Sequence, residues 1–385
     1  MKKVIVAGLV VTALSTSTLI PQVAKAEDNT LQLRSLGMEE NTTGLDESFN
    51  SISELGKQVP LLKAYGLAIL QQPNVKVNNN SSLTNQQYII KNRVKEWLDN
   101  YNPKLLELNE NTRAFSILFN SYYNTIYDLA TEVDDTEAKE SLIEAFEEIL
   151  GQAQMVHEDM AILSRNYNRY KELLTQDSSN LTDRVEQTID QLQGSNGEVD
   201  HLRTEVKYIL HDIQQELIKI SNNPSEVTKQ SLEISKLTTD IVATGINDNT
   251  LDFTALEGLT NKIFILSNDQ IKESATIIQN KINELKPLIQ KLSEQEIKIT
   301  NLIFIEDQVN GFSELIERQA TILGYVKDDW EGLNNRIGKI LTNLHEGSTD
   351  AKTLQTQLEN LKQINDEINK QTRQFQDVVI NVNVN

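Results

Sequence analysis

The stretch LIEAFEEILGQAQMVHEDMAILSRNYNRYKELL, residues 142–174, decides the fold of this chain. A spacing that averages 3.5 residues keeps one stripe of a long helix facing its neighbours over many turns. At ~1.5 Å per residue, the segment 136–193 predicts a helix roughly 85 Å long. The stripe consists of apolar and aromatic residues at alternating three- and four-residue steps: Leu142, Phe146, Ile149, Ala153, Val156, Met160, Leu163, Tyr167, Tyr170 and Leu174.

The same spacing continues on both sides of this stretch. It runs from Leu105 to Val133, from Ile271 to Leu292, from Ile305 to Leu344 and from Leu354 to Phe375. A further amphipathic helix is predicted for residues 46–72, with a kink at Pro60. Turns are predicted at Asp134-Asp135, Gly194–Gly197 and Gly347-Ser348.

Short connectors make neighbouring helices antiparallel, so the pattern predicts a mainly α fold, an elongated antiparallel bundle of long helices. A single long intermolecular coiled coil is the less favoured alternative, because several turns fold the chain back on itself.

Residues 225–270 interrupt the helical pattern. Short alternating and apolar pieces, separated by turn residues such as Gly245 and Gly258, predict a small β-patterned amphipathic insert. In the soluble state we expect it to cap one end of the bundle, and we expect its apolar side chains to contact a membrane or a partner protein later. The candidate contact residues are Ile241, Val242, Leu251, Phe253, Leu256, Ile263, Phe264, Ile265 and Leu266.

The first 26 residues predict a secretory signal. Lys2 and Lys3 precede a short apolar run, and Ala24-Lys25-Ala26 forms a small-x-small pattern with cleavage expected after Ala26. The net charge of the chain is −20, and loss of the three lysines of the signal lowers it to −23. Such a charge argues against nucleic acid as a partner and against electrostatic capture by anionic lipid. We therefore expect a secreted, extracellular protein whose membrane contacts depend on apolar surface or on a bound partner.

No catalytic, cofactor or metal site is predicted. The chain has no cysteine, and its four histidines are dispersed, without the spacing of a metal-binding motif. Acidic pairs, at Asp134/Asp135, Glu147/Glu148 and Asp328/Asp329, are interpreted as solvated surface. An aromatic group could form a stacking platform, but its helical spacing favours bundle core with the hydroxyls at the rim. It consists of Tyr122, Tyr123, Tyr127, Tyr167 and Tyr170.

Several longer stretches carry a family resemblance. They include AYGLAILQQP at 64–73, WLDNYNPK at 97–104, FNSYY at 119–123, LQGSNG at 192–197 and PLIQKLS at 287–293. Through them the chain resembles the Bacillus haemolytic enterotoxin family, the three-component pore-forming toxins. The resemblance implies a cytolysin A-like fold with a small α/β head that carries a β-tongue, placed at residues 225–270. It also implies action with two companion toxin components on host cell membranes.

This sequence differs from the membrane-inserting members of that family, whose heads contain a long, strongly apolar segment. The difference favours a subunit that is recruited onto companions already on the membrane. The alternative is a secreted adhesin rod that recognises a surface ligand through its head, and an unrecognised hydrolase is the least favoured reading.

The predicted organisation has five parts. They are a signal peptide at 1–26, a flexible segment at 27–45, the first part of the bundle at 46–224, the head with its β-tongue at 225–270, and the second part of the bundle at 271–385.

Overall fold

The computed structural model describes residues 49–71, 81–193 and 294–380, with single residues between 205 and 212 and between 273 and 284. The signal segment with Ala26 and residues 27–45 lie outside these ranges. So do residues 225–270, with all nine predicted contact residues of the head. The predictions for these segments therefore stay predictions.

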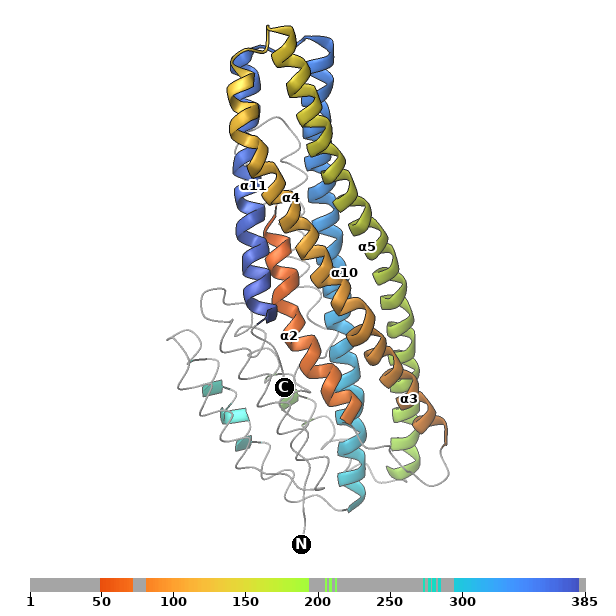
Figure 1. Cartoon of the computed structure of the whole chain (residues 1–385). Coiled ribbons are helices and arrows are strands. Elements are labelled where there is room, and N and C mark those ends of the chain that lie inside the picture. The colour runs from red at the N-terminus through yellow and green to blue at the C-terminus, as the bar shows by residue number, and fades with distance from the viewer. Residues whose placement is uncertain are drawn as a thin grey trace.

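Long helices make up nearly all of the described chain, and they run side by side as one elongated bundle (Figure 1). No strand occurs within the described ranges. The predicted antiparallel helical bundle is thus confirmed, while the α/β head falls outside the described residues. The elements are α2 (Asn50–Gln71), α3 (Ser81–Glu96), the π-helical turn η1 (Trp97–Tyr101), α4 (Asn102–Ala130), α5 (Thr136–Gln193), α10 (Glu294–Glu346) and α11 (Ala351–Ile380).

The predicted stripes form the core. On α5, all ten positions quoted from residues 142–174 are buried, and the stripe continues through Leu181, Val185 and Ile189. On α10 and α11 the predicted positions from Ile305 to Leu344 and from Leu354 to Phe375 are buried as well. α10 packs along α5 and α2, and α11 packs along α4 and α2.

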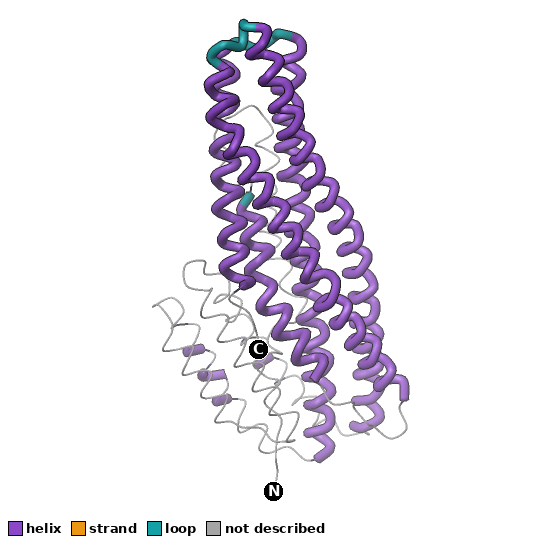
Figure 2. The backbone as a smooth tube through the Cα atoms, in the orientation of Figure 1, coloured by secondary structure: helices purple, strands orange, loops and turns teal. Residues whose placement is uncertain are grey.

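The α4–α5 and α10–α11 turns lie at the same end of the bundle (Figure 2). Asp135 caps α5, because its Oδ2 accepts hydrogen bonds from the amides of Glu137 at 3.0 Å and Ala138 at 3.1 Å. At the other turn Gly347 has a φ of 62°, a left-handed conformation that glycine adopts without a steric penalty. Asp350 then caps α11 by accepting the Thr353 amide at 2.7 Å, and this bond lowers the pKa of Asp350. These two of the three predicted turns are confirmed, and the third, Gly194–Gly197, lies outside the described residues.

Helix α2 is buried on nearly every side. Of its described side chains only Asn50 is exposed, since α10, α11 and α3 all contact it. The helix continues through Pro60, which removes one amide donor without ending it. Two glycines allow close approach: a Cβ at Gly56 would lie 2.7 Å from Cδ2 of Phe375, and one at Gly66 would lie 3.0 Å from Cγ1 of Val94.

Candidate functional site

The helical rod formed by α3 and α4 is interrupted by the π-turn at 97–101. There the Asn102 amide bonds to the Trp97 carbonyl, five residues earlier. Pro103, in the first turn of α4, has no amide hydrogen, so the α-helical bond to the Asp99 carbonyl cannot form. π-turns inside α-helices are rare and occur often at functional positions. This turn is therefore the first place to look for a functional site among the described residues.

Trp97 is the centre of a buried polar cluster at the π-turn. Its side chain is fully buried, and its indole nitrogen lies 2.9 Å from the Tyr167 hydroxyl and 3.2 Å from Oε1 of Gln319. The Tyr167 hydroxyl also donates to the same Gln319 oxygen. One indole, one phenol and one amide therefore join η1, α5 and α10.

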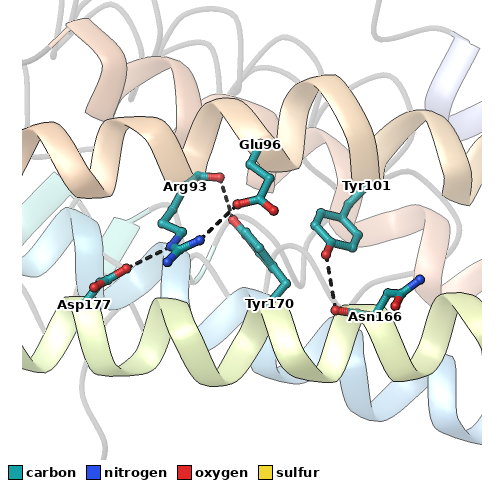
Figure 3. A network of polar contacts seen from close by, with 6 residues as sticks. All are labelled: Arg93, Glu96, Tyr101, Asn166, Tyr170 and Asp177. Carbon is teal, nitrogen blue, oxygen red and sulfur yellow. Dashed lines mark hydrogen bonds and ion pairs between the residues drawn. The ribbon is translucent and has the colours of Figure 1, made fainter.

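The tyrosines of this cluster are held in their neutral form. Burial raises the pKa of both Tyr167 and Tyr170 well above the usual value for a phenol. The Tyr170 hydroxyl donates to the Arg93 carbonyl at 2.9 Å, and the Tyr101 hydroxyl donates to the Asn166 carbonyl at 3.2 Å (Figure 3). These phenols act as hydrogen-bond donors, and none is placed as a proton-transfer group.

An ion pair lies one turn before the π-turn. Nε of Arg93 is 2.9 Å from Oδ2 of Asp177 on α5, and a second guanidinium nitrogen is 3.2 Å from Glu96 (Figure 3). The hydrogen bond to Asp177 raises the pKa of Arg93. Since Gln86 also donates to the Asp177 carbonyl, at 2.8 Å, one residue of α5 holds α3 through both its side chain and its backbone.

Glu314 of α10 is the described carboxyl group with a pKa closest to neutrality. The pKa of Glu314 is raised to about 7, mainly by burial and in part by the charge of Glu317, with Arg318 acting in the opposite direction. A single such carboxyl group does not form an acid–base pair.

The predicted tyrosine group divides into two parts. Tyr167 and Tyr170 are core residues, as expected, but their hydroxyls bond inside the bundle rather than at its rim. Tyr122, Tyr123 and Tyr127 are partly buried, and the Tyr127 hydroxyl reaches Glu359 on the surface as predicted. The hydroxyl position depends on how far each helix lies from the bundle axis, which the spacing alone does not give.

The prediction that the acidic pairs are solvated surface is wrong for one residue, Asp329. Asp329 is half-buried, and its Oδ2 accepts a hydrogen bond of 2.8 Å from the Ser51 hydroxyl of α2. Its neighbour Asp328 is exposed, as are Asp134, Asp135, Glu147 and Glu148. Asp329 therefore has a structural role in binding α2 to α10.

Other kinds of site have little support. Within the described ranges, no three His, Asp or Glu side chains come together as metal ligands. An open groove between α5 and α10 is lined by polar groups such as Lys171, Glu172 and Glu317, without an enclosed pocket. None of the helices described has the length and hydropathy to cross a membrane.

Comparison with known proteins agrees with this architecture. Residues 42–216 match the family described as Bacillus haemolytic enterotoxin (HBL). Comparison with curated protein sequences gave no match.

Three solved structures have a similar fold. The Bacillus cereus HblL1 toxin component is 14% identical, with a TM-score of 0.59 over 86% of this chain and 95% of that one. Soluble AhlB, from the tripartite alpha-pore forming toxin AHL of Aeromonas hydrophila, is 15% identical, with a TM-score of 0.58 over 88% of this chain and 94% of that one. Soluble SmhA, from the tripartite alpha-pore forming toxin Smh of Serratia marcescens, is 11% identical, with a TM-score of 0.59 over 89% of this chain and 97% of that one.

At such identities the structural matches show a shared fold. The family match of residues 42–216 rests on sequence and is therefore more specific than the shared fold. The match of residues 42–216, a little under half of the chain, and the long-helix fold both support a relationship to the Bacillus haemolytic enterotoxin family.

Proposed function

We propose that this chain is a secreted, non-enzymatic component of a multi-protein pore-forming enterotoxin. It assembles with two companion components on host cell membranes and permeabilises them. The observation that carries the proposal is the family match of residues 42–216 on a chain with this long-helix fold. Two of the structures with that fold are named as parts of tripartite pore-forming toxins.

The chemistry of the described residues supports a role in assembly. The tyrosines at the π-turn are neutral donors committed to internal hydrogen bonds, and the exposed carboxylates lie on turns and helix faces. A net charge of −20 does not favour direct adsorption to anionic lipid. Recruitment by companions already on the membrane suits such a chain better than insertion unaided.

The finer assignments rest on sequence. The quoted stretches resemble the A component of the non-haemolytic enterotoxin. The apolar residues of segment 225–270 are proposed to contact the membrane or the companions.

Dye entry into epithelial cells tests the proposal. The purified chain is applied alone, and with the two other components of a Bacillus haemolytic enterotoxin, while propidium iodide uptake is recorded. We expect uptake only with all components present. Lysis by the chain alone would contradict recruitment, and stable binding without any rise in permeability would indicate the adhesin instead.

Segment 225–270 is tested by a matched pair of substitutions. Phe253→Ser removes an apolar side chain of the alternating piece, whereas Thr254→Ser changes its polar neighbour by one methyl group. We expect the first to reduce lysis by about tenfold or more and the second to leave it unchanged, with equal helicity by circular dichroism. Equal lysis by both variants would remove the proposed contact role.

A further inference from the structure

The two halves of the rod on either side of the π-turn are held differently. Helix α4 packs on both α5 and α11, and it buries a long apolar row that includes Leu105, Phe115 and Ile126. Helix α3 packs mainly on α5 and touches α2. Its buried apolar side chains are only three, Leu83, Ile90 and Val94, while Tyr88 and Ile89 are exposed.

Polar bonds supply much of the attachment of α3. Arg93 and Gln86 both bond to Asp177, and the Tyr170 hydroxyl bonds to the Arg93 carbonyl. Hydrogen bonds and part-exposed ion pairs contribute little net stability, because water replaces them when they break. The attachment of α3 is therefore weaker than that of α4, although the two are consecutive parts of one rod.

The π-turn supplies a place where such a rod can bend. Pro103 removes a backbone hydrogen bond at the junction, and sharp helix bends occur at prolines and π-turns. Trp97 fixes the junction itself, since it is fully buried and bonded to Tyr167 and Gln319. The Nε2 of Gln319 is buried without a hydrogen-bond partner, so this anchor leaves one polar group unsatisfied.

We propose that α3 opens from the bundle as an intact helix about the π-turn, with its contact to Asp177 as the latch. Helix α4 stays packed on α5 and α11 throughout. Opening breaks the close contact between Val94 and Gly66 and exposes the apolar face of α3. This device requires neither membrane nor companion, so its failure would leave the proposed function untouched.

Hydrogen exchange of the purified chain at pH 7 tests the difference in attachment. Away from the bundle, a helix of 16 residues is only marginally stable in water, so its backbone hydrogen bonds break transiently whenever α3 opens. We therefore expect amides of residues 83–96 to exchange at least about tenfold faster than those of residues 105–126. Equal protection of the two segments would overturn the proposal.

Two substitutions should increase the opening, and one serves as a matched control. Asp177→Asn weakens the latch, and Gly66→Ala places a methyl group 3.0 Å from Val94 Cγ1. Each is expected to raise the rate of amide exchange in α3 about fivefold and to leave the rate in α4 unchanged. Asp159→Asn alters an equivalent α4–α5 contact, the exposed bond to Asn111, and should leave α3 unchanged. An effect of the control on α3 equal to that of Asp177→Asn would contradict the latch.

Distances between spin labels distinguish the hinge motion of an intact α3 from unfolding of that helix. The chain has no cysteine, so spin labels attach only to cysteines that are introduced. Tyr88→Cys places one label on α3 and Ile117→Cys one on α4, both at exposed positions. We expect two discrete distances, with the second more populated in the Asp177→Asn background. The pair Ile117→Cys and Met155→Cys, on α4 and α5, should give one distance in both backgrounds. A single narrow distance for the first pair, or a broad featureless distribution from melting of α3, would overturn the hinge.

Discussion

Helices α2 and α5 are built on opposite plans. α5 is 58 residues long and buries one stripe, while its outer face exposes even large side chains such as Met155, Ile162 and Leu173. α2 is 22 residues long, and contacts with α10, α11 and α3 cover almost all of it. An amphipathic helix such as α5 needs neighbours on one side only, whereas α2 buries side chains on several faces and needs several neighbours. The same substitution should therefore have different consequences on the two helices.

Glycine substitution is the strongest way to test this difference. In Gly56→Ala the new Cβ would lie 2.7 Å from Phe375 Cδ2 and 3.0 Å from its Cα, so α2 and α11 must separate. We expect a loss of about 2–3 kcal/mol in the free energy of unfolding, measured by urea denaturation. On α5, a Cβ at Gly151 meets nothing within 4 Å, so Gly151→Ala should stabilise by about 0.5–1 kcal/mol. Effects of the same sign would show that the enclosure of α2 is not tight.

The next effect concerns α10, the neighbour shared by α2 and α5. A folded-state pKa of about 7 for Glu314, above the usual 4.5, means that the folded state binds more protons between these values. The free energy of unfolding should therefore fall as pH rises from about 4.5 to about 7. Glu314→Gln removes the carboxylate and should stabilise by about 1–2 kcal/mol at pH 8, after discounting for its partial exposure, with little effect at pH 4.5.

The exposed Glu148→Gln on α5 controls for the change in net charge. A stabilisation by Glu314→Gln that is the same at pH 4.5 and pH 8 would exclude the buried carboxylate as its cause.

A serine pair gives the smallest effect. Ser51 of α2 is buried and donates to Asp329 at 2.8 Å, whereas the exposed Ser141 of α5 donates only to the Glu137 carbonyl of its own helix. Ser51→Ala should cost about 1 kcal/mol, because the half-buried carboxylate loses a donor. Ser141→Ala should stay within about 0.5 kcal/mol of the parent chain. Thermal unfolding of both variants measures the contrast, and an equal response would argue that the contact to Asp329 carries no net stability.

Sequence reasoning predicts α5 well and α2 less well, for a physical reason. In α5 the regular spacing of apolar residues from Leu142 to Leu174 is visible in the local sequence, and it determines which face is buried. In α2 the buried positions include Ser51, Ser53 and Gln58, which no hydrophobic pattern would select. Ser51, for example, is bonded to Asp329 of α10, 278 positions away in the chain.

The π-turn was not predicted, although a signal for it exists. WLDNYNPK contains Pro103 within a helical stretch. A proline there removes a backbone hydrogen bond, but it does not determine how the helix adjusts. Whether the result is a kink, a stop or a π-turn depends on the cavity that accepts Trp97. The residues around Trp97 come from α5 and α10, so the π-turn depends on tertiary contacts that the local sequence does not contain.

The long-range contacts of α2 also set the order in which the molecule can be completed. Ser51 and Asp329 are 278 positions apart, and Asn50 and Gln371 are 321 apart. A ribosome adds roughly 5–20 residues per second, so α2 waits tens of seconds after its own synthesis before its partners exist. The α10–α11 hairpin, closed by Gly347, can form as soon as it is made. Among the described helices, the first to be translated therefore waits longest for its final surroundings.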